Sequence, residues 1–136
     1  MQVNPYLTFN GKCEEAFNFY AKALNGKVVF KMTNAESPMA DKTPPDQRNR
    51  IMHATLQVGE RLIMGADAPP NYYTKPAGFS VSVNCKDMAE AERVYKALSE
   101  GGEVKMPLQE TFWSAGFGMF IDRYDIPWMV NVDQAM

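Results

Sequence analysis

Two stretches with the apolar spacing of an amphipathic helix recur along the chain at a nearly fixed distance. In residues 13–24, apolar side chains fall every three or four positions, and Gly26 follows as a stop signal. The same spacing returns in residues 87–98, where Asp87 supplies a capping residue and Gly102 follows. Gly26 and Gly102 lie 76 residues apart (102 − 26). Two helices with matched ends predict a duplicated unit, so the chain is restricted to folds with two similar halves.

Strand-like segments flank each predicted helix in the same order. Most of them alternate apolar and polar residues, which is typical of a strand with one buried face. The predicted strands are residues 3–9, 27–33, 51–58 and 61–65 in the first half, and residues 79–83, 103–108, 116–121 and 127–132 in the second. Each half therefore reads βαβββ, and the fold class is α+β. We expect one domain over residues 1–136, with modules 1–66 and 79–136 joined by a proline-containing linker at 67–78.

The alternation also predicts which side chains face a helix. One side of the segment 51–58 carries Met52, Ala54, Leu56 and Val58, and the other carries Ile51, His53, Thr55 and Gln57. We expect an antiparallel sheet with the helix covering the first of these sides. The second side mixes aromatic and polar residues, so it either meets water or lines a pocket. The residues that suit a pocket wall are Tyr6, His53, Ser80, Met129 and Asn131.

Composition narrows the functional classes. The formal net charge is −2 and the basic residues are scattered, so we expect no nucleic-acid partner. No apolar run reaches the roughly 18 residues of a membrane-spanning helix, and the first residues lack a signal-peptide pattern. We therefore expect no membrane partner and a cytoplasmic location. The two cysteines and single histidine do not suffice for a Cys/His zinc site, and we expect Cys13 and Cys85 to be buried or half-buried free thiols.

Three long segments resemble one protein family. They are NPYLTFNGKCEEAFNFYAKAL at 4–24, MHATLQVGERLIMGAD at 52–67 and LQETFWSAGFGMFIDRYDIPWMVNV at 108–132. They resemble PhnB-like proteins of the vicinal oxygen chelate superfamily, which also holds glyoxalase I, bleomycin-resistance proteins and extradiol dioxygenases. The resemblance spans essentially the whole chain. It implies paired βαβββ modules that form a U-shaped open barrel, usually in a homodimer.

The same resemblance bears on metal binding. Superfamily enzymes typically hold a divalent metal with His and Glu or Gln from the first and last strands of the modules, where it stabilises substrate oxygens. The matching positions here are Asn4 or Pro5, Ile63, Gly78 or Phe79, and Met129. Apart from a marginal Asn4, none of these is an ordinary metal ligand. We therefore predict no metal and no other cofactor, and keep a divalent metal as the alternative.

His53 and Glu110 are the candidate catalytic residues. Histidine side chains exchange protons near neutral pH, which suits general acid–base catalysis. Glu110 lies in the QETFW stretch, where it would orient His53 or act as a base itself. We expect both side chains to point into the cavity. The alternative is that His53 has a structural role and that Glu110 is a surface carboxylate or anchors a loop.

Aromatic and polar side chains supply the remaining site candidates. The predicted ligand-binding residues are Tyr6, Thr8, Ser80, Phe112, Trp113, Met129 and Asn131. Trp128 shares its side of the strand with Val130 and Val132, so we expect it in the core. The polar segment 35–50 is either a lid over the pocket or an exposed loop.

Three functions remain open at this stage. The preferred one is a metal-independent protein that binds a small molecule, with a homodimer implied by the family. The alternative is a lyase-like or dioxygenase-like enzyme that acts on a small carbonyl or aromatic metabolite through His53 and Glu110. A methyltransferase is disfavoured, because Gly116-Phe117-Gly118 is not the glycine-rich turn between a strand and a helix that binds nucleotide cofactors.

Overall fold

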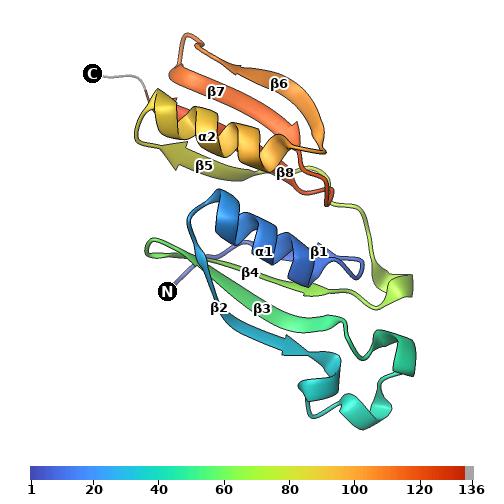
Figure 1. Ribbon diagram of the computed structural model, residues 1–136. Coiled ribbons are helices and arrows are strands. Elements are labelled where there is room, and N and C mark those ends of the chain that lie inside the picture. Colours follow the sequence, from blue (N-terminus) through green and yellow to red (C-terminus); the bar gives the residue numbers. More distant parts are fainter. Residues whose placement is uncertain (134–136) are drawn as a thin grey trace. The chain divides into compact units, whose positions relative to one another are not determined.

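The computed structural model describes residues 1–133, which form two compact units (Figure 1). The first unit is Met1–Thr74 and the second begins at Lys75. Each unit carries one α-helix and one four-stranded sheet, so the predicted α+β class and the duplication are confirmed. The predicted domain 1–136 and module 79–136 end at residues 134–136, which lie outside the described residues. No helix within residues 1–133 is long and apolar enough to cross a membrane.

The first unit contains four strands and one α-helix. In chain order they are β1 (Tyr6–Phe9), α1 (Cys13–Ala23), β2 (Lys27–Thr33), β3 (Ile51–Val58) and β4 (Arg61–Asp67). Short 3₁₀ turns follow β2 and β4; they are η1 (Asn34–Glu36), η2 (Ala40–Lys42), η3 (Pro45–Gln47) and η4 (Pro70–Tyr72).

The second unit repeats this order. Its elements are β5 (Val81–Cys85), α2 (Met88–Ser99), β6 (Glu103–Gln109), β7 (Ser114–Ile121) and β8 (Pro127–Asp133). The main difference between the units is the connection between the second and third strands. It covers residues 34–50 in the first unit and only residues 110–113 in the second.

Both sheets have the same strand order and the same mixed direction. The orders are β1-β4-β3-β2 and β5-β8-β7-β6. In each sheet the first strand pairs in parallel with the last, while the other pairs are antiparallel. The expectation of antiparallel sheets is therefore wrong. The helical crossover makes the second strand run in the direction of the first, and two reversals then return the last strand to that direction.

Each helix packs on one face of its own sheet. In the first unit, the ring of Phe9 lies 6.0 Å from that of Phe17 and 6.4 Å from that of Tyr20 on α1. Gly65 permits this close packing, because a Cβ there would lie 2.7 Å from the carbonyl oxygen of Leu7 and 2.8 Å from the Phe17 ring. Any larger residue at position 65 would push the helix off the sheet.

A bulge changes the expected facing of β3 at its start. Ile51 is buried and Met52 is 39% exposed, the reverse of what strict alternation predicts. In the pairing with β2, Met32 lies opposite His53 but Thr33 lies opposite Ile51. Met52 is thus the extra residue of a β-bulge, which inverts the alternation on its N-terminal side. Ala54 and Leu56, beyond the bulge, face α1 as predicted.

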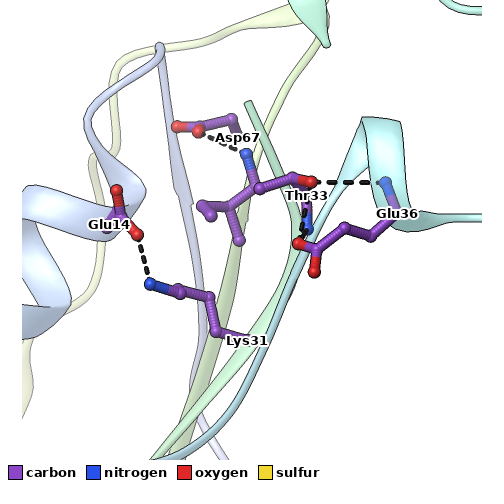
Figure 2. Close-up of polar contacts among 6 residues, drawn as sticks. Glu14, Lys31, Thr33, Glu36 and Asp67 are labelled. Atoms are coloured by element: carbon purple, nitrogen blue, oxygen red, sulfur yellow. Dashed lines mark hydrogen bonds and ion pairs between the residues drawn. The ribbon is translucent and has the colours of Figure 1, made fainter. Parts of the chain in front are cut away.

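Asp67 holds the beginning of α1 in place of a local cap. The N-cap residue Lys12 makes no capping side-chain bond. The Asp67 carboxylate instead accepts hydrogen bonds from the backbone N–H groups of Gly11 and Cys13, at 2.8 and 3.0 Å. Its other oxygen accepts the N–H of Ile51 at 2.9 Å, as Figure 2 shows. One carboxylate at the end of β4 therefore joins the helix N-terminus to the start of β3.

Two further polar contacts organise the edge of the first sheet (Figure 2). The Lys31 ammonium of β2 pairs with the Glu14 carboxylate of α1. Thr33 and Glu36 form a capping box around η1, with the Thr33 hydroxyl 2.9 Å from Glu36 Oε1. The first contact ties β2 to α1, and the second lies where β2 continues into the long connection.

The connection 34–50 is closed by its own hydrogen bonds. The N–H of Asn34 donates to the Arg50 carbonyl at 2.9 Å, which joins its two ends. The Arg48 guanidinium donates to the Ala40 carbonyl at 2.8 Å. The alternatives of a lid and an exposed loop both remain predictions.

The second unit is anchored by a buried carboxylate. Trp128 is fully buried, as predicted, and its indole N–H donates to Asp122 at 2.8 Å. The other oxygen of Asp122 accepts the backbone N–H groups of Tyr124 and Ile126, at 2.7 and 3.0 Å. These bonds close the turn between β7 and β8 and hold the Trp128 ring in the core of the second unit.

Candidate functional site

The sheet of the first unit has one face that α1 does not cover, and we call it the first open face. Its residues alternate with buried positions such as Leu7, Ala54 and Leu56. Cross-strand register places side chains of the same face opposite one another. One row of this face runs across all four strands as Tyr6, Met64, Thr55 and Phe30. The first open face is defined by Tyr6, Thr8, Phe30, Met32, His53, Thr55 and Met64.

His53 lies at the centre of the polar contacts on the first open face. The Tyr6 hydroxyl is 3.1 Å from Nδ1 of His53, and Thr55 Oγ1 is 3.2 Å from Nε2. Both ring nitrogens are thus engaged by hydroxyl groups. The imidazole also lies between two aromatic rings, with centroid distances of 5.6 Å to Tyr6 and 5.8 Å to Phe30.

The Tyr6 hydroxyl remains protonated at neutral pH. Partial burial removes water from the phenol and raises the pKa of Tyr6, and the nearby Cys13 raises this pKa further. The side chain is nevertheless 49% exposed. Tyr6 therefore offers a neutral hydroxyl group on an accessible surface.

The sheet of the second unit has a matching uncovered face, opposite α2, which we call the second open face. One row is Ser82, Met129, Met119 and Met106, and the next is Asn84, Asn131, Phe117 and Gln109. Phe117 continues into an aromatic chain, because its ring lies 5.5 Å from Trp113, which lies 4.7 Å from Phe112. This face is apolar and rich in thioethers, with amides and a hydroxyl at its side.

The structure brings two of the predicted site residues into direct contact. Tyr6 and His53 share a hydrogen bond on the first open face. Thr8 lies on the same face, two residues after Tyr6 on β1, and pairs with Ala66 of β4. The prediction that His53 and Glu110 share a cavity stays a prediction, because the two residues belong to different units.

The other predicted residues lie in the second unit. Met129 and Asn131 are on the second open face, half-buried. Ser80 precedes β5. The turn 110–113 carries the rest, with Glu110 exposed and Phe112 and Trp113 at 89% and 49% exposure.

Sequence reasoning missed Phe30 as a site residue. The register of β2 against β3 shifts between Val28 and Phe30, so strict alternation gives Phe30 no defined facing. Thr55 was placed on the correct side of β3, but its bond to His53 depends on side-chain geometry that periodicity does not report. Phe117 lies in the predicted strand 116–121, but the glycines on either side of it leave no alternation that indicates its facing.

The open faces do not offer the donor set of the superfamily metal site. On β1, β4, β5 and β8, the side chains on these faces include Tyr6, Thr8, Met64, Ala66, Ser82, Asn84, Met129, Asn131 and Asp133. Asp133 at the end of β8 supplies a single carboxylate, which accepts a hydrogen bond from Asn131 at 2.9 Å, and these positions hold no imidazole, so the ligand set that such a site needs is not assembled. Ile63, one of the positions matched by sequence, is buried on the helix side, and Met64 takes its place on the open face. Residues 1–133 hold no cluster of three or more His, Cys, Asp or Glu side chains suited to a metal ion.

Comparison with known proteins identifies the family. A family model described as "3-demethylubiquinone-9 3-methyltransferase" matches residues 1–131. A solved Bacillus cereus protein, described as a putative 3-demethylubiquinone-9 3-methyltransferase and PhnB protein, is 27% identical, with a TM-score of 0.80 over 97% of this chain and 99% of that one. The chain belongs to the PhnB-like family.

Two other relatives are more similar to this PhnB-like chain. The protein PA1353 from Pseudomonas aeruginosa is 46% identical, with a TM-score of 0.91 over 99% of both chains. Protein YjdN from Escherichia coli K12 is 31% identical over 140 residues, or 97% of this chain and 95% of that protein. The fosfomycin resistance protein FosX from Listeria monocytogenes is only 9% identical, with a TM-score of 0.66, and shows the shared glyoxalase/bleomycin-resistance fold.

Proposed function

We propose that this PhnB-like protein binds a small molecule on the first open face, without the divalent metal typical of its superfamily. The observation that carries the proposal is the hydrogen-bonded chain Tyr6–His53–Thr55, set among aromatic and thioether side chains. A few aligned polar groups on an otherwise apolar wall are typical of small-molecule sites. A sheet face that merely met water would instead favour charged and unconnected polar side chains.

The exposed rings on this face support the same proposal. Phe30 and Tyr6 are 44% and 49% exposed. Leaving such surface uncovered costs free energy, at about 25 cal/mol for each Å² of apolar area. A bound molecule with flat apolar surfaces would recover part of that cost.

The donor set supports the metal independence that we propose. Hydroxyl, amide, thioether and methyl groups occupy most open-face positions of β1, β4, β5 and β8, and Asp133 adds a single carboxylate at the end of β8. Hard or borderline divalent cations prefer imidazole and carboxylate ligands. The proposal therefore assigns recognition to hydrogen bonds and apolar contacts.

An enzyme acting on a small carbonyl or aromatic metabolite is the second candidate. The observation that favours it is that His53 links two hydroxyl groups, which gives a path for a proton between Tyr6 and Thr55. Glu110 would take part in such catalysis only if its carboxylate reaches the same ligand as His53.

A methyltransferase activity, named in the family model's description, has no support from the glycine pair of β7. A Cβ at Gly116 would lie 2.5 Å from the Met88 sulfur, and one at Gly118 would lie 3.1 Å from Leu108 Cα. Both glycines therefore serve the packing of β7 against α2 and β6. They do not form a nucleotide-binding turn.

A thermal-shift screen tests the proposal. Protein freed of metals with EDTA is screened against a library of small aromatic and carbonyl compounds, and compounds that raise Tm are retested on two variants. We expect Tyr6→Phe to lose at least half of each shift, because it lacks the hydroxyl on the first open face. Tyr72→Phe, a matched change at a tyrosine that is 79% exposed outside the sheets, should retain the full shift. Equal shifts in both variants, or shifts that require added metal, contradict the proposal.

A further inference from the structure

We infer that the Tyr6 hydroxyl is the group that meets the ligand, that His53 and Thr55 hold it in the role of hydrogen-bond donor, and that the site takes an uncharged molecule carrying a carbonyl-type acceptor. This inference rests on the proposed function. It also changes the role of His53 from candidate catalytic base to positioning residue.

The distances around His53 fit two tautomers, and the different exposure of the two hydroxyl groups favours one of them. A neutral imidazole has one donor nitrogen and one acceptor nitrogen, while each hydroxyl both donates and accepts. Within residues 1–133, Nε2 of His53 is the one acceptor in reach of the Thr55 hydroxyl, 3.2 Å away. The neighbours of Thr55 in its row are Met64 and Phe30, which offer no strong acceptor. The Tyr6 hydroxyl, on a side chain that is 49% exposed, can turn its hydrogen outward, whereas Thr55 is half-buried. Our inference therefore has Thr55 donate to Nε2 and places the proton of the imidazole on Nδ1.

This tautomer decides what Tyr6 presents. With its proton on Nδ1, His53 donates to the Tyr6 oxygen, 3.1 Å away. The hydrogen of the Tyr6 hydroxyl is then left without an acceptor among the described residues and points away from His53. Because burial raises the pKa of Tyr6, the hydroxyl keeps this hydrogen at neutral pH. The site thus offers one oriented donor.

The surroundings of that donor set the charge of the ligand. Tyr6 lies opposite Met64, and His53 lies opposite Met32. No charged side chain shares these rows, so an anion bound here would be desolvated without a counter-charge. Flexible thioethers and the Phe30 ring instead favour a flat apolar body. An uncharged ring bearing a carbonyl oxygen satisfies both requirements.

His53 makes the test direct, because it is the chain's only histidine. Protein labelled with ¹⁵N in histidine gives the signals of one imidazole, and these signals show which nitrogen carries the proton. At pH 8, three probes of similar shape are titrated: acetophenone, benzoate, and α-methylstyrene, in which a CH₂ group replaces the carbonyl oxygen. We expect acetophenone to shift the His53 signals with the proton on Nδ1. We expect the other two to bind about fivefold more weakly, since one hydrogen bond is worth about 1 kcal/mol.

Variants separate a positioning role from simple packing. Tyr6→Phe should bind acetophenone and α-methylstyrene equally, and Tyr72→Phe should behave as the unchanged protein. Thr55→Val keeps the shape of the side chain but removes its hydroxyl, so it should move the imidazole proton toward Nε2 and reduce the preference for acetophenone. Thr55→Ser should restore both.

Two results would overturn the inference in different ways. If α-methylstyrene binds the first open face as tightly as acetophenone, or if Nε2 carries the proton in the complex, the inference is wrong and the proposed function stands. If none of the three probes perturbs residues of this face, the inference and the proposed function both fail.

Discussion

Cys13 illustrates how burial controls chemistry at a single residue. Its side chain is fully buried, and this burial, with the nearby carboxylates of Asp67 and Glu14, raises the pKa of the thiol. The prediction of two buried free thiols is confirmed, since Cys85 is also buried and unpaired with Cys13. A thiol with a raised pKa stays neutral in the native state under conditions where the unfolded chain already ionises it.

The raised pKa of Cys13 has a measurable consequence for stability. Its contribution is fully present below the ordinary thiol pKa of about 8.5, and is lost as pH rises from there toward the higher pKa of the folded state. We expect the free energy of unfolding to fall by up to about 1.4 kcal/mol per pH unit above that point on account of this thiol. Urea unfolding at pH 7.5, 8.5 and 9.5 checks the slope. Cys13→Ala should flatten it, and parallel profiles for the two proteins would rule the explanation out.

Residues of the candidate site differ in how far the sequence predicts them. His53 stands out as the only histidine in the chain, and the predicted facing of both strands places it on the same face as Tyr6. Their hydrogen bond depends on the strand order β1-β4-β3, which the alternation does not predict. Phe30 is not predicted as a site residue, because one bulged residue before it breaks the alternation of β2. Bulges depend on local packing, and period-two patterns carry no signal for them.

At the level of elements, the two helices begin in different ways. The carboxylate of Asp87 caps α2 by accepting the N–H of Glu90 at 2.8 Å, as the sequence predicts. The N-terminus of α1 depends on Asp67, which is more than 50 residues away in the chain and accepts three backbone N–H groups. Sequence reasoning cannot find such a cap, because nothing local to residues 10–13 indicates it.

The two caps allow a matched test with one substitution. Asp67→Asn leaves a single acceptor oxygen for three donors and places an NH₂ group near a backbone N–H, so we expect a loss of about 2–3 kcal/mol. Asp87→Asn should change stability by less than about 0.5 kcal/mol, because asparagine caps helices as well as aspartate does. Chemical denaturation of both variants gives the comparison. Equal losses would show that Asp67 does not organise the first unit.

At the level of the whole molecule, the duplication was predictable but the strand directions were not. Helix spacing and strand order repeat in both halves, and both sheets have the same topology. The parallel pairs β1–β4 and β5–β8 join segments far apart in the chain, and alternation alone does not report which strands become neighbours. The family resemblance predicts the fold. The differences from the metal ligands of the superfamily, which bear on function, lie in the side chains of the open faces.

Mapping of ligand contacts on metal-free protein tests the central claim most directly. Backbone amide spectra are recorded with EDTA while the strongest compound from the thermal-shift screen is titrated in. We predict that the largest shifts fall on residues of the first open face, around Tyr6, His53 and Phe30, and that their size does not change when Mg²⁺, Mn²⁺ or Zn²⁺ replaces EDTA. Shifts confined to other parts of the chain, or shifts that appear only with a metal, would contradict metal-independent binding at this face.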